Sequence, residues 1–256
     1  MTGELLRERR GAVLIVRLNR PEARNALNVA LIDGIGRAML DAENDPEIRA
    51  VVLTAAGDRI FCSGMDLREF ASGGGGTASA EGMAGFMRLA QGELAVPVVG
   101  AANGTAVGGG LELLLGCDVI VAAETAKFGL PEVKRGLYPA GGGTNIGTRI
   151  PLAIALEMTM TGDPIEARRA FELGLVNAVA APERVLDTAV EIAERIAGNA
   201  PLALAAIKEL VRLAVTDATR AAERNKDLQA SVFSSQDAIE GAAAFVEKRK
   251  PVWTGR

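Results

Sequence analysis

Stretches of aliphatic and β-branched residues recur along the first half of the chain, and helix-like segments separate several of them. Four of these stretches are AVLIVRLN, AVVLTA, PVVGAAN and CDVIVAAE, at residues 12–19, 50–55, 97–103 and 117–124. Short apolar runs bounded by turn residues predict buried strands. The helix expected at 29–44 follows Asn28, a residue type that commonly caps helices. Strands that alternate with helices predict an α/β fold.

The pattern changes after Pro151, where helix-like segments follow one another and strand signals nearly vanish. The one strand expected in this part is LVNAV at 175–179. We therefore place a boundary near residue 195, which gives an α/β core at 1–195 and a helical region at 196–256. The helical patterns lie at 152–160, 165–174, 183–197, 201–215, 219–233 and 234–250.

Composition limits the class of protein. A chain of 256 residues with 49% hydrophobic and 23% charged residues is typical of a soluble globular protein. The net charge of −4 argues against nucleic acid or an anionic membrane as a partner. The N-terminus lacks the apolar core of a signal peptide, and no uncharged apolar stretch has the length of a membrane span.

The cysteines and the absence of histidine restrict the chemistry. Cys62 and Cys117 lie in apolar surroundings without CxxC spacing, which predicts packed thiols in a reducing cytoplasm rather than a metal site or disulfides. The chain contains no histidine. Catalysis through a histidine base or a histidine-bound metal is therefore excluded, and carboxylates, other titratable side chains and backbone dipoles remain.

Two glycine-containing turns each precede an expected helix. They are CSGMDL at 62–67 and AVGGGLE at 106–112. Each is compatible with an ordinary tight turn. If the two face one another, however, their N–H groups could together hold one developing oxyanion, because helix N-termini favour negative charge. Neither turn matches a dinucleotide or P-loop motif.

Two glutamates are candidate acid–base groups. Glu112 stands among leucines behind Gly108–Gly110, with no cation three or four residues away to form a helical ion pair. It is either a solvent-facing helical residue or a tuned catalytic carboxylate. Glu132, in FGLPEV, lies beside Lys134 and Arg135, and taken alone it is typical of a solvent-facing loop.

Six motifs in order closely resemble the crotonase superfamily, and within it the enoyl-CoA hydratases. The resemblance extends from about Ala12 to Trp253. The motifs are LNRPEARNAL, AVVLTAAGDRIFCSGMDL, PVVGAANGTAVGGGLELLLGCDVIVA, FGLPEVKRGLYPAGGGT, MTMTGDPIEARRAFELGLVNAV and EGAAAFVEKRKPVW.

The resemblance implies a spiral of ββα units and a C-terminal helical region that makes trimer contacts. It implies an acyl-CoA thioester as substrate and a homotrimer or dimer of trimers. The thioester oxygen would bind the backbone N–H groups of Met65 and Gly109. Glu112 would activate water and Glu132 would deliver a proton, as in the hydratases that retain both glutamates. No metal or redox cofactor is implied, since coenzyme A is part of the substrate.

The resemblance also supplies candidate contacts for the coenzyme A moiety. Arg24 and Lys248 would contact phosphates, Lys248 from a neighbouring subunit in an oligomer. The remaining candidates form one short segment, Ser63, Met65, Asp66, Leu67 and Arg68, with the Ser63 backbone near the adenine.

Two stretches depart from the usual hydratase pattern. NIGTRIP stands where a sequence like QRLPR follows GGGT, and it leaves the acyl preference open. SGGGGTASAEG at 72–82 is expected to be a mobile insertion or lid. The alternatives to a hydratase are a Δ3,Δ2-enoyl-CoA isomerase or another crotonase-type acyl-CoA enzyme, and a non-catalytic protein that binds CoA thioesters or RNA.

Overall fold

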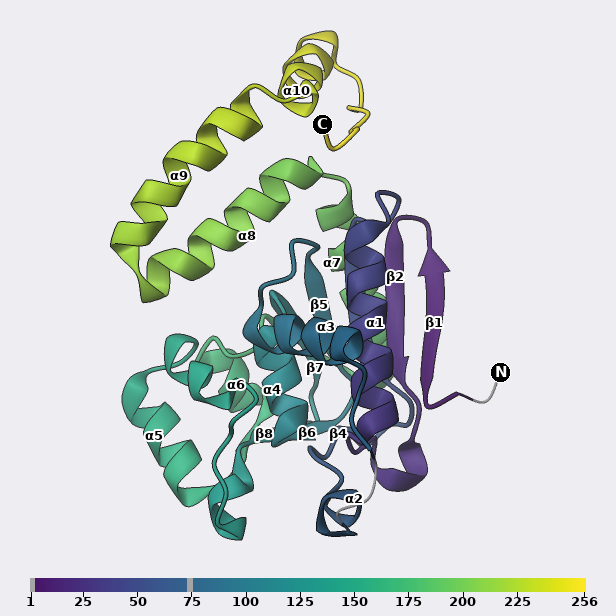
Figure 1. Ribbon diagram of the computed structural model, residues 1–256, viewed down its shortest axis with the longest axis vertical. Helices are drawn as coiled ribbons and strands as arrows, with labels where there is room; N and C mark the ends of the chain where they lie inside the picture. Colours follow the sequence, from purple (N-terminus) through teal and green to yellow (C-terminus); the bar gives the residue numbers. More distant parts are fainter. Residues whose placement is uncertain (1–2, 73–75) are drawn as a thin grey trace.

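A computed structural model describes residues 3–72 and 76–256 and contains one large, mostly parallel sheet (Figure 1). The strand order is β1-β2-β3-β5-β7-β10, and only the β1–β2 pair is antiparallel. The strands β3 and β5 are buried along their whole length, which explains their continuous apolar sequences. The bounds are β1 (Leu5–Arg10), β2 (Val13–Leu18), β3 (Ala50–Ala55), β5 (Val98–Ala102), β7 (Val119–Ala123) and β10 (Ala178–Ala180).

A second sheet is built from very short strands in the order β4-β6-β8-β9. Three successive passes of the chain give one strand to each sheet, as β3 then β4, β5 then β6, and β7 then β8. This is the predicted spiral of ββα units, and the α/β fold class is confirmed. The bounds are β4 (Ile60–Cys62), β6 (Thr105–Val107), β8 (Lys127–Gly129) and β9 (Ile165–Glu166).

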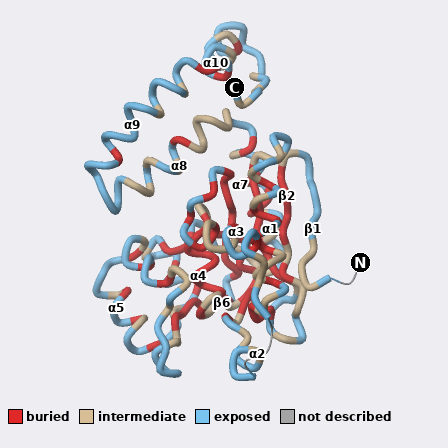
Figure 2. The backbone as a smooth tube through the Cα atoms, viewed as in Figure 1, coloured by how far each residue is buried: buried red, intermediate tan, exposed pale blue. Residues whose placement is uncertain are grey.

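Four helices pack on the sheets or on one another, and the buried segments are concentrated among these elements (Figure 2). The helix α7 packs on β3, β5 and β7, whereas α1 packs on β1 and β2 and on α3. Every leucine of α4 is buried, so this helix runs through the core. The bounds are α1 (Val29–Asn44), α3 (Ala80–Gln91), α4 (Gly109–Gly116) and α7 (Val185–Ala197).

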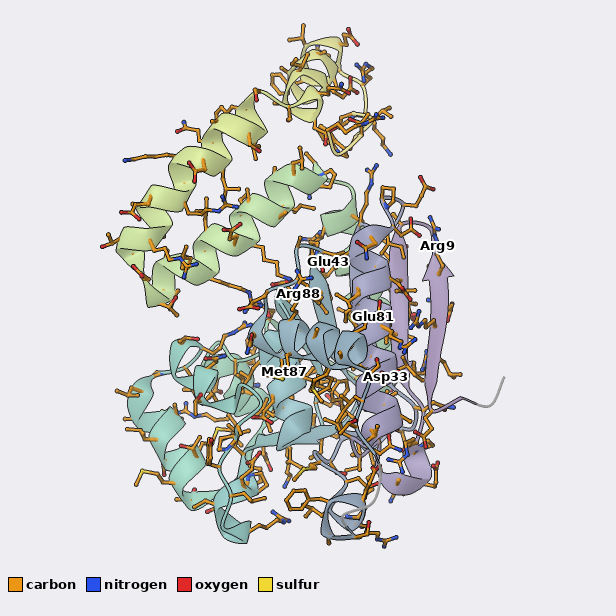
Figure 3. All side chains as sticks on the ribbon, in the orientation of Figure 1. Arg9, Asp33, Glu43, Glu81, Met87 and Arg88 are labelled. Carbon is orange, nitrogen blue, oxygen red and sulfur yellow. The ribbon has the colours of Figure 1, made fainter. Side chains whose placement is uncertain are left out.

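The helices α1 and α3 cross with their backbones in contact. A Cβ on Gly36 would lie 1.7 Å from the carbonyl oxygen of Gly82, so no larger residue fits there. Polar pairs hold both ends of the crossing: Asp33 accepts from the Ser79 N–H at 2.9 Å, and Glu43 pairs with Arg88 (Figure 3). This contact fixes α3, which in turn packs on α4.

The C-terminal helices α8 (Pro201–Thr216), α9 (Ala218–Phe233) and α10 (Gln236–Glu247) extend away from the sheets (Figure 1). The sequence boundary at 195/196 falls within the last turn of α7, where Ala193 and Ala197 are still buried against the core. The C-terminal segment turns back, so that the indole N–H of Trp253 donates to the Gly198 carbonyl at 2.7 Å. The division into 1–195 and 196–256 stays a prediction.

Several local expectations differ from the structure. Residues 165–166 form β9 and only Ala167–Glu172 form the helix α6, within the segment expected to be helical at 165–174. The expected lid at 72–82 includes residues 73–75, which lie outside the described residues; its end is regular, because Ser79 caps α3 by accepting from the Gly82 N–H. Within residues 3–72 and 76–256, no helix is long and apolar enough to cross a membrane.

Candidate active site

The short strands β4, β6 and β8 are parallel neighbours, and their register brings three loops to one edge. Cys62 pairs with Ala106, and Ala106 pairs with Phe128. The carboxyl ends of parallel strands meet at the same edge of a sheet, where ligand sites commonly form. Three or four residues beyond this row lie Met65, Gly109 and Glu132. The small sheet therefore brings together three residues of which the first and the last are 67 positions apart in sequence.

The two glycine turns are in direct backbone contact. Gly64 has φ +88°, and a Cβ there would lie 3.1 Å from the Gly109 nitrogen. A Cβ on Gly110 would lie 2.3 Å from the Cys62 carbonyl oxygen. Leu27 holds the first turn, because its N–H donates to the Gly64 carbonyl at 2.8 Å and its carbonyl accepts from the Asp66 N–H at 2.9 Å. Only glycine permits this approach.

The N–H groups of Met65 and Gly109 lie at this contact between the turns. Across the described part of the chain, neither N–H donates a hydrogen bond to a protein acceptor. Gly109 is the first residue of α4, where the unpaired N–H groups and the helix dipole favour negative charge. The pair is therefore suited to bind an oxygen atom that gains negative charge during a reaction.

Glu112 lies one turn into α4 and is 9% exposed. Its Oε1 accepts hydrogen bonds from the N–H of Gly141 at 2.8 Å and of Gly143 at 2.9 Å. Burial raises the pKa of Glu112, and these two N–H groups oppose that rise by stabilising the charged form. Of the two alternatives from the sequence, the solvent-facing one is wrong, because the carboxyl group is buried and bound by backbone donors.

Glu132 lies in the 3₁₀ helix η2 (Pro131–Arg135), directly after β8. A Cβ on Gly108 would lie 3.2 Å from the Oε1 of Glu132. The Glu132 carboxyl group therefore reaches the glycine turn before α4. Its Oε2 is buried and has no hydrogen-bond partner in the described part of the chain. Burial raises the pKa of Glu132, and the negative charge of Glu112 raises it further. Taken alone, the sequence favoured a solvent-facing residue, and this was wrong.

The two carboxyl groups thus have different surroundings. Glu112 has two N–H donors that favour its ionised form, whereas the unpaired buried oxygen of Glu132 favours its protonated form. Neighbouring carboxyls with different protonation states can act as a base and an acid in one reaction. The arrangement is suited to acid–base chemistry beside a bound oxyanion.

Sequence reasoning missed two residues that support the first turn. Asn25 is fully buried with φ +52°, accepts from the Arg20 N–H, and donates to the carbonyls of Ala56 and Ile60. The Arg20 guanidinium donates to the Ala26 carbonyl at 2.7 Å and pairs with Asp66 at 3.2 Å. An asparagine in a left-handed conformation gives only a weak signal in a sequence.

The candidate coenzyme A contacts lie in different places. The carbonyl of Arg24 accepts from the Ser63 N–H at 3.2 Å, so these two residues lie beside the Met65 turn. The Asp66 carboxylate is bonded to Arg20 and to the Arg68 N–H, whereas Leu67 opens the helix α2 (Leu67–Ser72) and is exposed. Lys248 ends α10, at the opposite end of the molecule from α2 (Figure 1). Within one chain Lys248 is therefore not part of this site.

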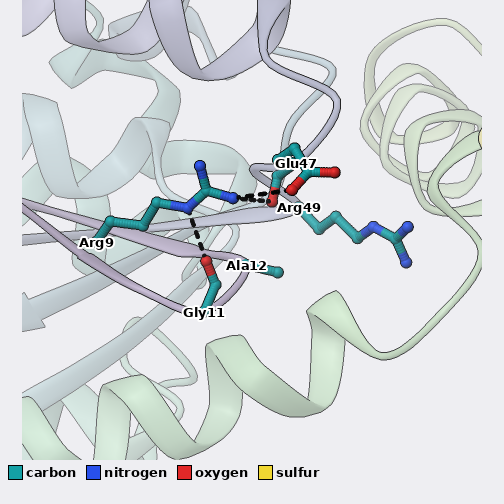
Figure 4. A pocket seen from close by; sticks show the side chains of 5 residues that line it. All are labelled: Arg9, Gly11, Ala12, Glu47 and Arg49. Carbon is teal, nitrogen blue, oxygen red and sulfur yellow. Dashed lines mark hydrogen bonds and ion pairs between the residues drawn. The ribbon is translucent and has the colours of Figure 1, made fainter.

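A separate hollow of about 330 Å³ lies on the surface beside the β1–β2 turn (Figure 4). Arg9 crosses it and donates to the Gly11 carbonyl at 2.9 Å and to Glu47 at 3.4 Å. None of the predicted site residues lines it. Its charged side chains already have partners, so it does not compete with the site at the small sheet.

A ββα spiral with two facing backbone donors and two glutamates at one edge defines a protein of the crotonase class. The profile of the enoyl-CoA hydratase/isomerase family matches residues 8–256. The chain belongs to this family. Its relatives include hydratases and dehydratases that act on CoA thioesters, and the chain is accordingly a hydro-lyase of the crotonase type.

Curated relatives and solved structures align over nearly the whole chain. The carnitinyl-CoA dehydratase of Proteus mirabilis is 40% identical over 96% of this chain and 97% of its own. An enoyl-CoA hydratase structure from Mycobacterium tuberculosis superposes with a TM-score of 0.91 at 43% identity, covering 99% of both chains. A carnitinyl-CoA hydratase structure from Mycobacterium avium gives 0.79 at 39% identity and covers both chains fully.

Proposed function

We propose that this protein catalyses the reversible hydration of 2-enoyl-CoA to 3-hydroxyacyl-CoA. The observation that carries the proposal is the unequal pair of carboxyl groups beside two backbone N–H donors that no described protein acceptor occupies. Glu112 is held by two N–H groups, whereas Glu132 has a buried oxygen with no partner among residues 3–72 and 76–256. The likeness to hydratases and dehydratases over the whole chain supports the same reaction class.

The first step is polarisation of the thioester. Its carbonyl oxygen accepts hydrogen bonds from the N–H groups of Met65 and Gly109, which draws electron density from the conjugated double bond and makes Cβ electrophilic. Neither N–H is occupied by a described protein acceptor, so no internal bond must break first. One donor of this kind typically contributes about 100- to 1,000-fold in rate.

Water is then added across the double bond. Glu112 takes a proton from the water whose oxygen attacks Cβ, and the double-bond electrons move toward Cα and the thioester oxygen. Glu132 gives its proton to Cα, which restores the thioester carbonyl. The two carboxyls have then exchanged protonation states, and proton exchange resets them. The dehydration of a 3-hydroxyacyl-CoA is the same sequence in reverse, with the roles interchanged.

The coenzyme A moiety is proposed to lie along Arg24 and the Ser63–Arg68 segment, because these residues flank the Met65 turn. Met65, Leu67 and Arg68 present exposed side chains there. The Asp66 side chain is occupied by Arg20, so we propose that Asp66 contributes by shaping the turn. Lys248 would reach this site only from another subunit.

The proposal is tested by adding the protein to crotonyl-CoA and following the loss of enoyl absorbance. Longer and branched enoyl-CoAs belong in the panel. Carnitinyl-CoA, which the relatives' names suggest, is tested in the dehydration direction, where enoyl absorbance should appear. Persistence of every substrate would overturn the proposal. Deuterium exchange with double-bond migration but no hydroxyacyl product would identify an isomerase, whose activity through Glu132 alone should survive Glu112→Gln. Tight acyl-CoA binding without turnover would indicate a binding protein.

We further propose a homotrimer or dimer of trimers, joined through the C-terminal helices. Ile207, Val211 and Val215 lie four residues apart on α8 and are each more than 60% exposed. An apolar stripe of this kind is unfavourable in water and typical of a contact surface. The two buried free thiols suit a reducing, cytoplasmic setting. The proposed reaction uses only carboxyl groups and backbone donors, and so requires no cofactor.

A further inference from the structure

Residues 141–149 contact the helix α4 at both of its ends, and this segment is called the α4 strap here. At the N-terminal half of α4, the N–H groups of Gly141 and Gly143 hold the Glu112 carboxylate. At the C-terminal end, the Arg149 guanidinium donates to the carbonyls of Leu115 at 2.8 Å and Cys117 at 2.5 Å. Between these contacts lies the 3₁₀ helix η3 (Gly143–Thr148), whose buried Ile146 faces the core.

The helix α4 itself is held firmly by its neighbours. A Cβ on Gly110 would lie 2.3 Å from the Cys62 carbonyl oxygen, and one on Gly116 would lie 1.9 Å from that of Leu89. The backbone at Cys62 and at Leu89 therefore packs closely against the two ends of α4. The strap contains three consecutive glycines and only one charged side chain. Arg149 supplies that charged anchor.

The surroundings of Arg149 make this anchor a strong one. The last carbonyls of a helix carry partial negative charge, and a cation bound to them is stabilised. Burial lowers the pKa of Arg149, and the positive charge of Arg212 lowers it further. A guanidinium nevertheless stays protonated at any physiological pH. Asp118 balances the nearby cations and pairs with Lys208 at 2.8 Å and Arg212 at 2.9 Å from α8. The Cys117 carbonyl accepts from both arginines.

We propose that Arg149 is a positioning residue: it fixes the α4 strap so that the Gly141 and Gly143 N–H groups hold Glu112 in its reactive orientation. This proposal rests on the proposed function for its kinetic consequence only. Arg149 donates to backbone carbonyls and has no hydrogen bond to Glu112. The charges that act on this carboxyl pair are those of Glu112 and Glu132 on one another and that of Arg135 on Glu132. Any effect of Arg149 on Glu112 is therefore indirect, and the strap is the segment that joins the Arg149 contacts to the N–H groups on Glu112.

The test compares Arg149→Met and Arg149→Lys with the control Arg168→Met, whose arginine side chain is 88% exposed on α6. The full chain is labelled with ¹³C at the glutamate carboxyl groups and titrated by NMR, and the Glu112 signal is assigned from Glu112→Gln. Weaker N–H bonds to a charged carboxylate should raise the Glu112 pKa by about one unit in Arg149→Met. We expect a smaller rise in Arg149→Lys and none in Arg168→Met.

With crotonyl-CoA as substrate, a displaced strap should leave Glu112 poorly oriented. We expect kcat to fall by about 10- to 100-fold in Arg149→Met, with KM changed less than about threefold. The acid limb of the kcat profile should move to higher pH, because Glu112 must be ionised to act. An unshifted Glu112 titration in a folded Arg149→Met variant would overturn the proposal. If that variant does not fold, an unshifted titration in Arg149→Lys overturns it instead.

The titration does not depend on turnover, so the two proposals can fail separately. Inactivity of the unsubstituted protein toward every enoyl-CoA, together with a shifted Glu112 titration in Arg149→Met, would refute the proposed hydratase activity and support the strap. Normal hydratase activity of the unsubstituted protein, together with an unchanged Glu112 titration in Arg149→Met, would support the proposed hydratase activity and refute the role of the strap. A loss of thermal stability in Arg149→Met without a shifted titration or acid limb would show a purely structural role and would also overturn the proposal.

Discussion

Gly64 and Gly109 lie in backbone contact, and a Cβ on Gly64 would stand 3.1 Å from the Gly109 nitrogen. This contact is what brings the N–H groups of Met65 and Gly109, 44 positions apart, to one place. The carboxyl groups of Glu112 and Glu132 approach the same glycine turn, near Gly109 and Gly108 respectively. The proposed chemistry therefore depends on glycine as much as on the glutamates.

Gly64→Ala should lower kcat/KM for crotonyl-CoA by about 100-fold or more, because the new methyl group crowds the Gly109 N–H. Gly57→Ala is the matched control. Its φ of +92° is similar, but its Cβ would meet only Pro21, at 3.7 Å. Both variants should lose roughly 1–2 kcal/mol in the free energy of unfolding, from the strained backbone. Equal kinetic losses in the two variants would refute a special role for the turn contact.

Glu112→Gln should preserve the fold, because the amide oxygen can still accept from Gly141 and Gly143. The general base is lost, so kcat for hydration should fall by about 100- to 10,000-fold with KM nearly unchanged. Glu124→Gln, at an exposed position after β7, is the control and should keep full activity. Steady-state kinetics and a thermal melt of each variant check this prediction. A Glu112→Gln variant that hydrates at the normal rate would rule out the assigned base.

Glu132→Gln should reduce the dependence of stability on pH. The folded state raises the pKa of Glu132, so this group's contribution to stability is full below the ordinary carboxyl pKa and is lost as pH rises through the folded value. The free energy of unfolding is measured by denaturant at about pH 5 and about pH 8. Its decrease between these two pH values should be smaller in Glu132→Gln than in the unsubstituted protein. Glu183→Gln, an exposed control, should behave like the unsubstituted protein. An unchanged pH dependence in Glu132→Gln would contradict the raised pKa.

Val211→Asp should break the proposed assembly, because it places a charge in the exposed apolar stripe of α8. We expect light scattering after size exclusion to give a trimer or hexamer mass for the unsubstituted protein and a lower mass for the variant. The control Arg59→Asp also introduces a carboxylate, but on the surface of the α/β part of the chain, where the Arg59 side chain is 91% exposed. This variant should leave the mass unchanged. A monomeric unsubstituted protein would refute the proposed assembly.

The long strands and helices could be predicted because local patterns of apolar residues indicate which segments are buried. The strands β2, β3, β5 and β7 are predominantly apolar, and α1 begins after Asn28 as expected. The hairpin strand β1 was missed because its sequence, LLRERR, is mostly charged and its last four residues are exposed. The three-residue strands of the small sheet are too short for a periodic signal.

The site was only partly accessible from sequence. The glycine turns and Glu112 stood out by composition, and the resemblance to the crotonase superfamily supplied Glu132. The parallel register of Cys62, Ala106 and Phe128, which brings these residues together, is a long-range property that no local pattern encodes. The N–H groups of Gly141 and Gly143 were also missed, because backbone donors leave no side-chain signature. The glycine run in PAGGGT was their only trace.

The most direct test of the central claim is mass spectrometry of the product formed from crotonyl-CoA in ¹⁸O-labelled water. The account predicts 3-hydroxybutyryl-CoA that carries one oxygen from the solvent, formed by the unsubstituted protein and nearly abolished in Glu112→Gln. Unlabelled substrate whose double bond has only moved, or equal labelling with and without the Glu112 carboxylate, would contradict it.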